Sequence, residues 1–225
     1  MSESKGVAVA IIDYGVGNLR SVQKAFAANG HEAVVTSNPE VIRTAERVVL
    51  PGVGAFGAAA DTLREVGLEG IAKEAAASGK PFLGICVGMQ LLFTDSEEMG
   101  LHRGLDLVPG HVLRFDERNL GVAAQGVKVP QIGWNSLSFP EDGNGAELFD
   151  GIPEGSLVYF VHSYFCSPND TRAIAATTDF IAPYCSAVAR GNVYGVQFHP
   201  EKSGAVGLRI LDNFARMPSR VSALV

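Results

Sequence analysis

The sequence predicts an α/β protein built on an open, mostly parallel twisted sheet, flanked by helices and extended by antiparallel strands. In the first half, short apolar runs alternate with segments of helical periodicity, the order that parallel strands joined by helices produce. The second half is richer in short strands separated by Gly, Asn and Pro. No linker, repeat or low-complexity tract interrupts the chain, so we expect residues 1–225 to form a single domain.

Composition supports a packed protein and excludes several classes. Apolar residues make up 47% of the chain and charged residues 19%, which disfavours disorder. The net charge of −6 leaves no basic footprint for nucleic acid or anionic lipid. No apolar run approaches the roughly 18 residues that span a bilayer. Three cysteines form no disulfide framework, so we expect a cytoplasmic protein.

The first half of the chain supplies the parallel strands. Residues 7–12 form a continuous apolar run, typical of a strand covered on both faces. Residues 18–29 have helical spacing and stop at Gly30, a common residue after a helix end. The elements expected next are a strand at 32–36, a helix capped by Asn38 with Pro39 in its first turn, a strand at 47–50, helices at 58–66 and 68–77, a strand at 81–85 and the start of a helix at 87–93.

The second half supplies the antiparallel additions and a closing helix. The expected strands lie at residues 112–115, 136–139, 156–162, 172–177, 184–189 and 193–198, and the helix at 205–215. Trp134 could belong to the core or anchor an interface, and from the residue alone we favour the core. His162 reads as core or as the wall of a pocket.

The segment Gly-Ile-Cys-Val-Gly at residues 84–88 carries the clearest chemical signal. It falls between a buried strand and a helix and has the form of a nucleophile elbow with Cys in place of Ser. Glycines permit the sharp turn, and a helix N-terminus favours the thiolate of Cys86. The amide of Val87 is placed to stabilise an oxyanion. The alternative is a buried structural cysteine beside glycines that only turn the chain.

A second segment, Gly-Val-Gln-Phe-His-Pro-Glu at residues 195–201, ends a predicted strand. Residues i and i+2 of a strand project to the same side, so Glu201 can orient the imidazole of His199. A cysteine nucleophile needs such a base, and a base needs an orienting acid. Alone, the segment could be a surface His-Glu pair; together, the two segments complete each other.

A glycine-rich loop, Pro-Gly-Val-Gly-Ala-Phe at residues 51–56, follows the third predicted strand. Ligands of open α/β sheets bind beyond the carboxyl ends of the strands, where Cys86 also lies. We expect a second oxyanion donor near Gly52 or Val53. A phosphate loop is disfavoured because no Gly-Lys-Ser/Thr follows, whereas a simple turn stays possible. The spacing at residues 13–18 fails the dinucleotide pattern, and no zinc spacing occurs.

Taken together, these segments resemble the class I, or triad, glutamine amidotransferases, whose fold is flavodoxin-like. The likeness covers almost the whole chain, in family order: residues 12–19, 50–56, 84–90, 130–135, 159–164 and 195–203. Asp-Tyr-Gly-x-Gly-Asn at the start and Gly-Trp-Asn at 133–135 resemble one branch of the family. That branch supplies ammonia to a (β/α)₈ cyclase subunit of histidine biosynthesis.

The resemblance implies roles for individual residues. Cys86, His199 and Glu201 would form a catalytic triad that hydrolyses L-glutamine to glutamate and ammonia. Backbone groups of the oxyanion site would come from Gly52, Val53 and Val87, and Gln90 would bind glutamine. The residues expected to meet the cyclase in a heterodimer are Asn18, Trp134 and Lys202.

The same resemblance implies that the cyclase uses the ammonia to make imidazole glycerol phosphate and aminoimidazole carboxamide ribotide, and that glutamine hydrolysis needs no metal or cofactor. Two alternatives stay open. The chain could feed another synthase, such as one making anthranilate or guanylate, although the opening and Gly-Trp-Asn segments speak against it. It could also be a silent regulatory subunit, which an intact Cys-His-Glu set disfavours.

Overall fold

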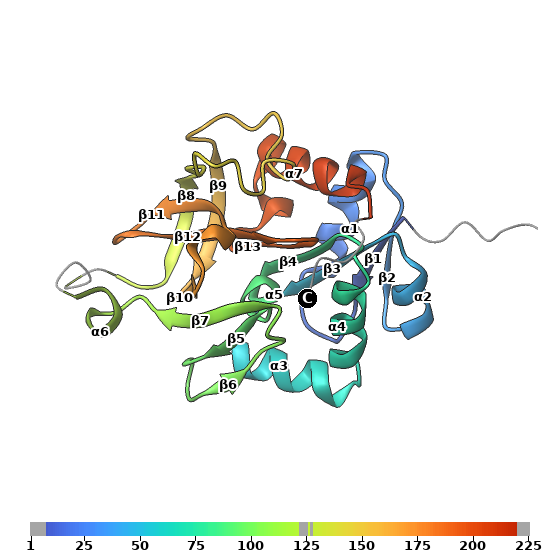
Figure 1. Cartoon of the computed structure of the whole chain (residues 1–225), viewed down its shortest axis with the longest axis horizontal. Coiled ribbons are helices and arrows are strands. Elements are labelled where there is room, and N and C mark those ends of the chain that lie inside the picture. The colour runs from blue at the N-terminus through green and yellow to red at the C-terminus, as the bar shows by residue number, and fades with distance from the viewer. Residues whose placement is uncertain (1–7, 122–125, 127, 220–225) are drawn as a thin grey trace, which may run out of the picture.

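The parallel half of the main sheet is formed by the strands that carry the glycine-rich loops. The computed structural model describes residues 8–121, 126 and 128–219. Five strands lie side by side in the order β2 (Ala33–Thr36), β1 (Val9–Ile12), β3 (Arg47–Gly52), β4 (Phe82–Cys86) and β13 (Val193–Val196), all parallel (Figure 1). Every residue of β1, β4 and β13 is buried, which explains their continuous apolar runs.

The rest of this sheet is mainly antiparallel. Beyond β13 follow β12 (Pro183–Arg190), β10 (Tyr164–Pro168), β7 (Val108–Arg114), β5 (Phe93–Ser96) and β6 (His102–Arg103), and β11 (Ile174–Asp179) pairs with β12. Only β5 and β7 are parallel neighbours in this half. The described residues thus form an eleven-stranded mixed sheet.

A separate two-stranded sheet lies beside the main one (Figure 1). Its antiparallel strands are β8 (Gln131–Ser136) and β9 (Leu157–His162). Gln131 lies opposite His162, and Trp134 opposite Tyr159. Along β8 exposed and less exposed residues alternate, so one face of this small sheet remains open.

Helices cover both faces of the parallel half (Figure 1). On one face α1 (Leu19–Ala28) packs against α7 (Gly204–Arg216) and η3 (Pro200–Lys202). On the other lie α3 (Phe56–Glu65) and α4 (Glu69–Ala77), with α2 (Pro39–Thr44) against α4. The short elements are α5 (Val87–Gln90), α6 (Glu117–Leu120) and η2 (Thr171–Ala173).

The predicted fold class is confirmed, and so is the cap of α2, where the Asn38 side chain accepts a hydrogen bond from the Glu40 amide at 2.9 Å. Two elements were predicted wrongly. The helix expected from residue 87 to 93 ends at Gln90, because Phe93 is fully buried in β5 and pairs with β7. The strand expected at 136–139 lies earlier, at Gln131–Ser136, since it pairs with β9.

Several boundaries also shift. β13 ends at Val196 rather than at residue 198, and the strand expected at 172–177 begins only at Ile174, after η2. β5, β6 and β10 were not predicted as strands. Residue 7, at the start of the strand expected at 7–12, and residues 122–125 and 127 lie outside the described residues. That residues 1–225 form a single domain stays a prediction.

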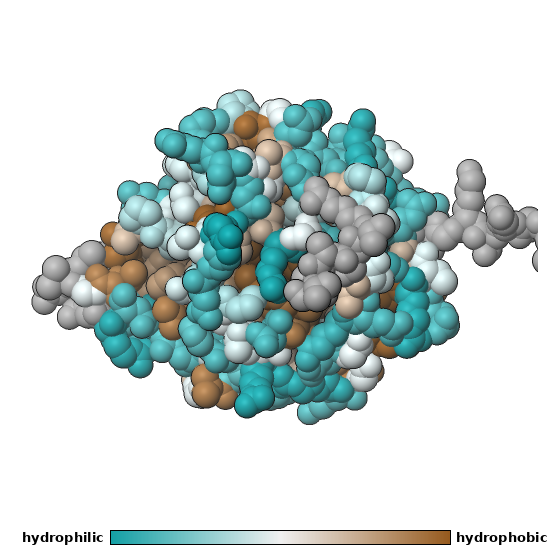
Figure 2. Space-filling view, in the orientation of Figure 1, coloured by the Kyte–Doolittle hydropathy of each residue, from teal (hydrophilic) through white to brown (hydrophobic). Residues whose placement is uncertain are grey.

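The face shown in Figure 2 is predominantly hydrophilic, with apolar residues in separate groups. Over the ranges that the structure describes, no helix has the length and apolarity needed to cross a bilayer.

Candidate active site

Cys86 occupies the last position of β4, at the turn into α5. Its backbone has φ 56° and ψ −115°, a left-handed conformation that costs energy for any residue with a Cβ atom. This strained turn presents the side chain above the carboxyl edge of the sheet, as the elbow pattern predicts. α5 is a single turn, so its dipole is a weaker source of thiolate stabilisation than the sequence indicated.

Three glycines allow the close backbone contacts of the elbow. A Cβ atom at Gly88 would lie 1.8 Å from the Leu50 carbonyl oxygen, a distance that no backbone tolerates. Cβ atoms at Gly84 and at Gly52 would each lie 2.6 Å from backbone atoms of Gly88. Gly52 and Gly88 therefore allow the start of α5 to lie directly against β3, and Gly84 allows β4 to lie directly against Gly88.

His199 lies at the same edge because β13 is the parallel neighbour of β4. Its Nδ1 is 2.9 Å from Oε1 of Glu201, and both side chains are almost fully buried. Burial lowers the pKa of His199, but hydrogen bonds with Cys86 and Glu201, together with their negative charges, raise it to about 9. The three predicted triad residues are thus brought together, with a charged imidazole between two acidic groups.

The backbone around His199 is held in place by β9. The His199 amide donates to the Tyr159 carbonyl at 2.9 Å, and the Ser203 hydroxyl donates to the His199 carbonyl at 2.7 Å. The Tyr159 amide in turn donates to the Ser203 hydroxyl at 3.0 Å. These bonds fix the bend that Pro200 introduces, so His199 and Glu201 can face each other although they do not lie in one regular strand.

A pocket of about 210 Å³ opens beside the sulfur atom. Its volume suits a molecule the size of a free amino acid. It is lined by Gly54, Cys86, Val87, Gln90, Glu98, Pro130, Val161, His162, Ser163 and Tyr164. Of the predicted site residues, Cys86, Val87 and Gln90 line this pocket. The other four catalytic and oxyanion residues, His199, Glu201, Gly52 and Val53, are not among its lining residues.

Gln90 is 3% exposed, and its amide nitrogen has two hydrogen-bond acceptors. Its Nε2 donates to the Tyr164 carbonyl at 3.2 Å and to Oε1 of Gln197 at 3.1 Å. Gln197 is completely buried, and its Nε2 lies 3.8 Å from the Cys86 sulfur. Sequence analysis missed Gln197, although its position two residues before His199 places it on the same side of the chain.

The loop after β3 reaches the elbow as predicted. Gly52 lies opposite Cys86 in the β3–β4 register, and Val53 is 37% exposed beyond it. The Tyr14 hydroxyl donates to the Pro51 carbonyl at 3.0 Å and so holds the start of this loop in place. Burial and the negative charge of Cys86 raise the pKa of Tyr14, which keeps it a hydrogen-bond donor. The sequence had suggested no such role for the segment that contains Tyr14.

Glu98 is a second residue that sequence analysis missed. It lines the pocket, and its Oε2 accepts a hydrogen bond from the Phe56 amide at 2.6 Å, at the start of α3. The carboxylate is thus fixed at a helix N-terminus, where negative charge is favoured, and adds a negative charge to the pocket wall.

The three residues assigned to a partner surface lie around β8, β9 and η3. Trp134 is 55% exposed, so the expectation that it belongs to the core is wrong; β8 turns its ring outward, where it packs edge-on to Tyr159 at 6.1 Å. The Lys202 ammonium lies 5.8 Å from the same tyrosine ring. Asn18 precedes α1, which packs against η3.

The other two cysteines differ from Cys86. Cys166 and Cys185 face each other across β10 and β12 as buried free thiols. Burial, with the charges of the other cysteines, raises the pKa of Cys166, and burial raises the pKa of Cys185 to about 12. Both remain protonated and unreactive at neutral pH.

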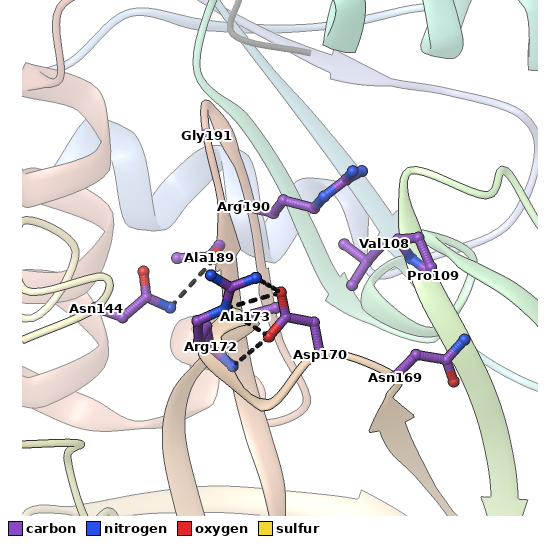
Figure 3. Close-up of a pocket in the computed structure, with 10 residues that line it drawn as sticks. All are labelled: Val108, Pro109, Asn144, Asn169, Asp170, Arg172, Ala173, Ala189, Arg190 and Gly191. Atoms are coloured by element: carbon purple, nitrogen blue, oxygen red, sulfur yellow. Dashed lines mark hydrogen bonds and ion pairs between the residues drawn. The ribbon is translucent and has the colours of Figure 1, made fainter. Parts of the chain in front are cut away.

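A different pocket, of about 490 Å³, lies at the opposite edge of the sheet (Figure 3). Arg190 and Gly191, which line it, form the turn that enters β13, whereas Cys86 lies where its parallel neighbour ends. Arg172 is paired with Asp170 at 2.8 Å, and none of the predicted site residues reaches this pocket. Among the described residues, no group of three or more His, Cys, Asp or Glu side chains could hold a metal ion.

Known proteins resemble this chain over most of its length. A family model described as glutamine amidotransferase class-I matches residues 10–217. The chain is 51% identical over 207 residues to the imidazole glycerol phosphate synthase subunit HisH of Geobacter metallireducens, covering 92% of this chain and 97% of that protein. It is 51% identical over 210 residues to the subunit of the same name from Methylococcus capsulatus, covering 92% and 95%.

Solved structures show the same fold at low identity. A crystal structure of glutamine amidotransferase has a TM-score of 0.69 and 19% identity, covering 93% of this chain and all of the other. The PurLQS structure from Thermotoga maritima also has a TM-score of 0.69 and 19% identity, covering 92% and 96%.

Proposed function

Because the chain belongs to the class I glutamine amidotransferase family, we propose that it is the glutaminase subunit of an imidazole glycerol phosphate synthase in histidine biosynthesis. It hydrolyses glutamine to glutamate and passes the ammonia to a partner subunit. The observation that carries this proposal is the buried His199–Glu201 pair beside the Cys86 elbow, because it supplies a proton donor and acceptor next to a cysteine that lines a pocket.

The reaction is an acyl transfer in two steps. The Cys86 thiolate attacks the side-chain amide carbon of glutamine, and the His199 imidazolium gives its proton to the leaving ammonia. A water molecule, deprotonated by His199, then attacks the thioester, which releases glutamate and regenerates the thiolate. Glu201 keeps the imidazole oriented throughout.

Backbone amides stabilise the negative oxygen of both tetrahedral intermediates. The Val87 amide begins α5 and has no acceptor within the helix, so it is free to bind the oxygen. The second donor comes from the loop at Gly52 and Val53, which Gly52 and Gly88 allow to lie against the elbow. Gln90 holds the glutamine substrate in the pocket next to Cys86.

The partner is a (β/α)₈ cyclase subunit that makes imidazole glycerol phosphate and aminoimidazole carboxamide ribotide, and the complex acts in the cytoplasm. Trp134, Lys202 and Asn18 meet the cyclase. This assignment is supported by the outward position of the Trp134 ring and by the Lys202 ammonium beside Tyr159, since exposed aromatic and cationic side chains are typical of interface anchors.

Glutamate release by the purified chain, measured with and without the cyclase and its ribotide substrate, tests this function. We expect release to require Cys86 and to rise when the cyclase and ribotide are added. The Cys86→Ala variant should release no glutamate, yet its complex should still make imidazole glycerol phosphate from added ammonia. Glutamate release that persists in Cys86→Ala would refute the triad, and wild-type activation by a different synthase would refute the pathway.

A further inference from the structure

A chain of side-chain amides connects the pocket wall to the nucleophile. It starts at the Tyr164 carbonyl, passes through the amide of Gln90 and the amide of Gln197, and ends at the Cys86 sulfur. Gln90 is 3% exposed and Gln197 is fully buried, so neither amide can exchange these partners for bulk water. Breaking any of these bonds would leave a buried polar group unpaired.

The chemistry of the first acceptor fixes the direction of every bond in this chain. A backbone carbonyl only accepts, so the Gln90 group that faces Tyr164 must be its NH₂. The second hydrogen of that NH₂ points to Gln197, which must therefore present its oxygen to Gln90. The remaining group of Gln197, an NH₂, is then the one that faces the Cys86 sulfur. If the Gln197 amide were flipped, its NH₂ would face the NH₂ of Gln90, so two donors would meet. Its oxygen would then face the sulfur, so two acceptors would meet.

The Tyr164 carbonyl is itself held by a second donor. His162 Nδ1 lies 2.7 Å from it, and because the carbonyl only accepts, this nitrogen carries the proton. The same carbonyl thus receives one bond from His162 and one from Gln90. Two donors therefore hold the Tyr164 carbonyl in place, and this carbonyl sets the direction of the hydrogen bonds that lead to the sulfur.

We propose that Gln197 is a positioning residue that keeps an N–H group directed at the Cys86 sulfur while its oxygen holds Gln90 in the pocket. The inference rests on the proposed glutaminase function and assigns it one further residue. Gln197 and His199 lie two residues apart and approach the sulfur from the same stretch of chain after β13. One segment therefore supplies both the proton acceptor and a fixed hydrogen-bond donor to the nucleophile.

An N–H donor stabilises the anionic sulfur more than the neutral thiol, because hydrogen bonds to charged groups are the stronger ones. It favours the thiolate before attack and again when the thioester breaks and the sulfur leaves with its electron pair. The two hydrogens of the Gln90 NH₂ are bound by the Tyr164 carbonyl and by the Gln197 oxygen. Gln90 can therefore offer only its own oxygen to a ligand. The structure therefore predicts separate effects on the sulfur and on substrate binding.

Alkylation of Cys86 by iodoacetamide as a function of pH tests this directly, because it reports the thiolate without requiring glutamine turnover. The rate is followed by mass spectrometry of the peptide that contains Cys86, with Cys86→Ala as the background for the buried cysteines. Gln197→Met removes the N–H donor at similar volume. Gln90→Met is the matched comparison, since it removes the donor that orients the Gln197 amide but keeps the Gln197 N–H groups themselves.

We expect Gln197→Met to move the midpoint of the alkylation profile up by about one pH unit, and kcat at neutral pH to fall about tenfold. Gln90→Met should shift the midpoint less than Gln197→Met does, because the Gln197 N–H donor is still present, and it should raise KM for glutamine. If Gln197→Met fails to fold, Gln197→Glu keeps an oxygen towards Gln90 and should also raise the midpoint.

An unchanged midpoint in folded Gln197→Met, or equal shifts in both methionine variants, would overturn the proposal. Because alkylation needs no substrate, this result is independent of glutaminase activity. A wild-type chain that fails to hydrolyse glutamine would refute the proposed function while the alkylation profiles still decide the role of Gln197.

Discussion

At the scale of single residues, two buried histidines near the pocket are driven to opposite charge states by their neighbours. Burial lowers the pKa of both. For His199, hydrogen bonds and negative charge from Cys86 and Glu201 overcome that effect and raise the pKa to about 9. His162 has no carboxylate partner in the described part of the chain; burial and the charge of His199 lower its pKa to about 4, although Nδ1 bonds the Tyr164 carbonyl. His199 is therefore protonated at neutral pH and can donate a proton, whereas His162 is neutral and forms part of the pocket wall.

The neutral state of His162 predicts a loss of stability in acid. In the unfolded chain His162 binds a proton below pH 6.5, whereas in the fold it resists protonation down to about pH 4. Its contribution is therefore complete above pH 6.5 and is lost as the pH falls to 4, by about 3 kcal/mol. His199 has the opposite sign: its contribution is lost as the pH rises from 6.5 to 9.

Urea unfolding of the wild type and of His162→Gln, above pH 6.5 and near pH 4, measures this contribution. The wild type should lose more free energy of unfolding between the two conditions than the variant, which has no group to protonate at that position. Equal losses in both proteins would show that His162 is not kept neutral by the fold.

At the scale of elements, the elbow depends on a backbone contact between β3 and the start of α5. The glycines at 84 and 88 were predicted to permit a sharp turn. The structure adds that a Cβ atom at Gly88 would strike β3, whereas one at Gly84 would strike the backbone of Gly88 and Met89 in α5. The strain at Cys86 is sustained because β4 is paired on both sides, to β3 and β13. A small change in this contact should disturb the nucleophile without touching its side chain.

Gly88→Ala should destabilise the protein by about 3 kcal/mol and abolish glutaminase activity, since the new Cβ would overlap the Leu50 carbonyl. Gly70→Ala in α4 is the control: nothing lies within 4 Å of its Cβ position, and its stability should change by less than about 1 kcal/mol. Thermal unfolding and glutamate release measure both. A Gly88→Ala variant with wild-type stability and turnover would contradict the proposed contact.

The sequence predicted best those elements whose pattern is local. The parallel strands read as continuous apolar runs because they are buried on both faces, and Cys86 and His199 stand in recognisable segments. β8 was misplaced because its outward residues, Ile132 and Trp134, are large and apolar. Gln197 was missed because its role is a tertiary hydrogen bond to Cys86, 111 residues away, which no local spacing reveals.

At the scale of the whole molecule, the surface proposed for the partner is joined to the catalytic base through one residue. The ring of Tyr159 contacts Trp134 and Lys202 on the outside, and the carbonyl of the same residue accepts the His199 amide. A partner that moves this aromatic pair would therefore act on the backbone that holds His199. The proposed partner would thus have a route by which to act on glutamine hydrolysis.

Trp134→Ala should weaken binding of the cyclase at least about tenfold while leaving the free energy of unfolding nearly unchanged, because the ring is 55% exposed. Val66→Ala is the control, since Val66 is 50% exposed at the end of α3. Isothermal titration with the cyclase measures both. Equal affinities for the two variants would remove Trp134 from the interface.

The most direct test of the catalytic account is covalent labelling of the wild-type chain with an electrophilic glutamine analogue, followed by peptide mass spectrometry. Cys86 lies in the pocket beside a protonated His199, whereas burial keeps Cys166 and Cys185 as thiols. We expect a single label, on Cys86, that free glutamine prevents. A chain that stays unlabelled, or that is labelled on another cysteine, would contradict the assignment of Cys86 as the nucleophile of a glutaminase.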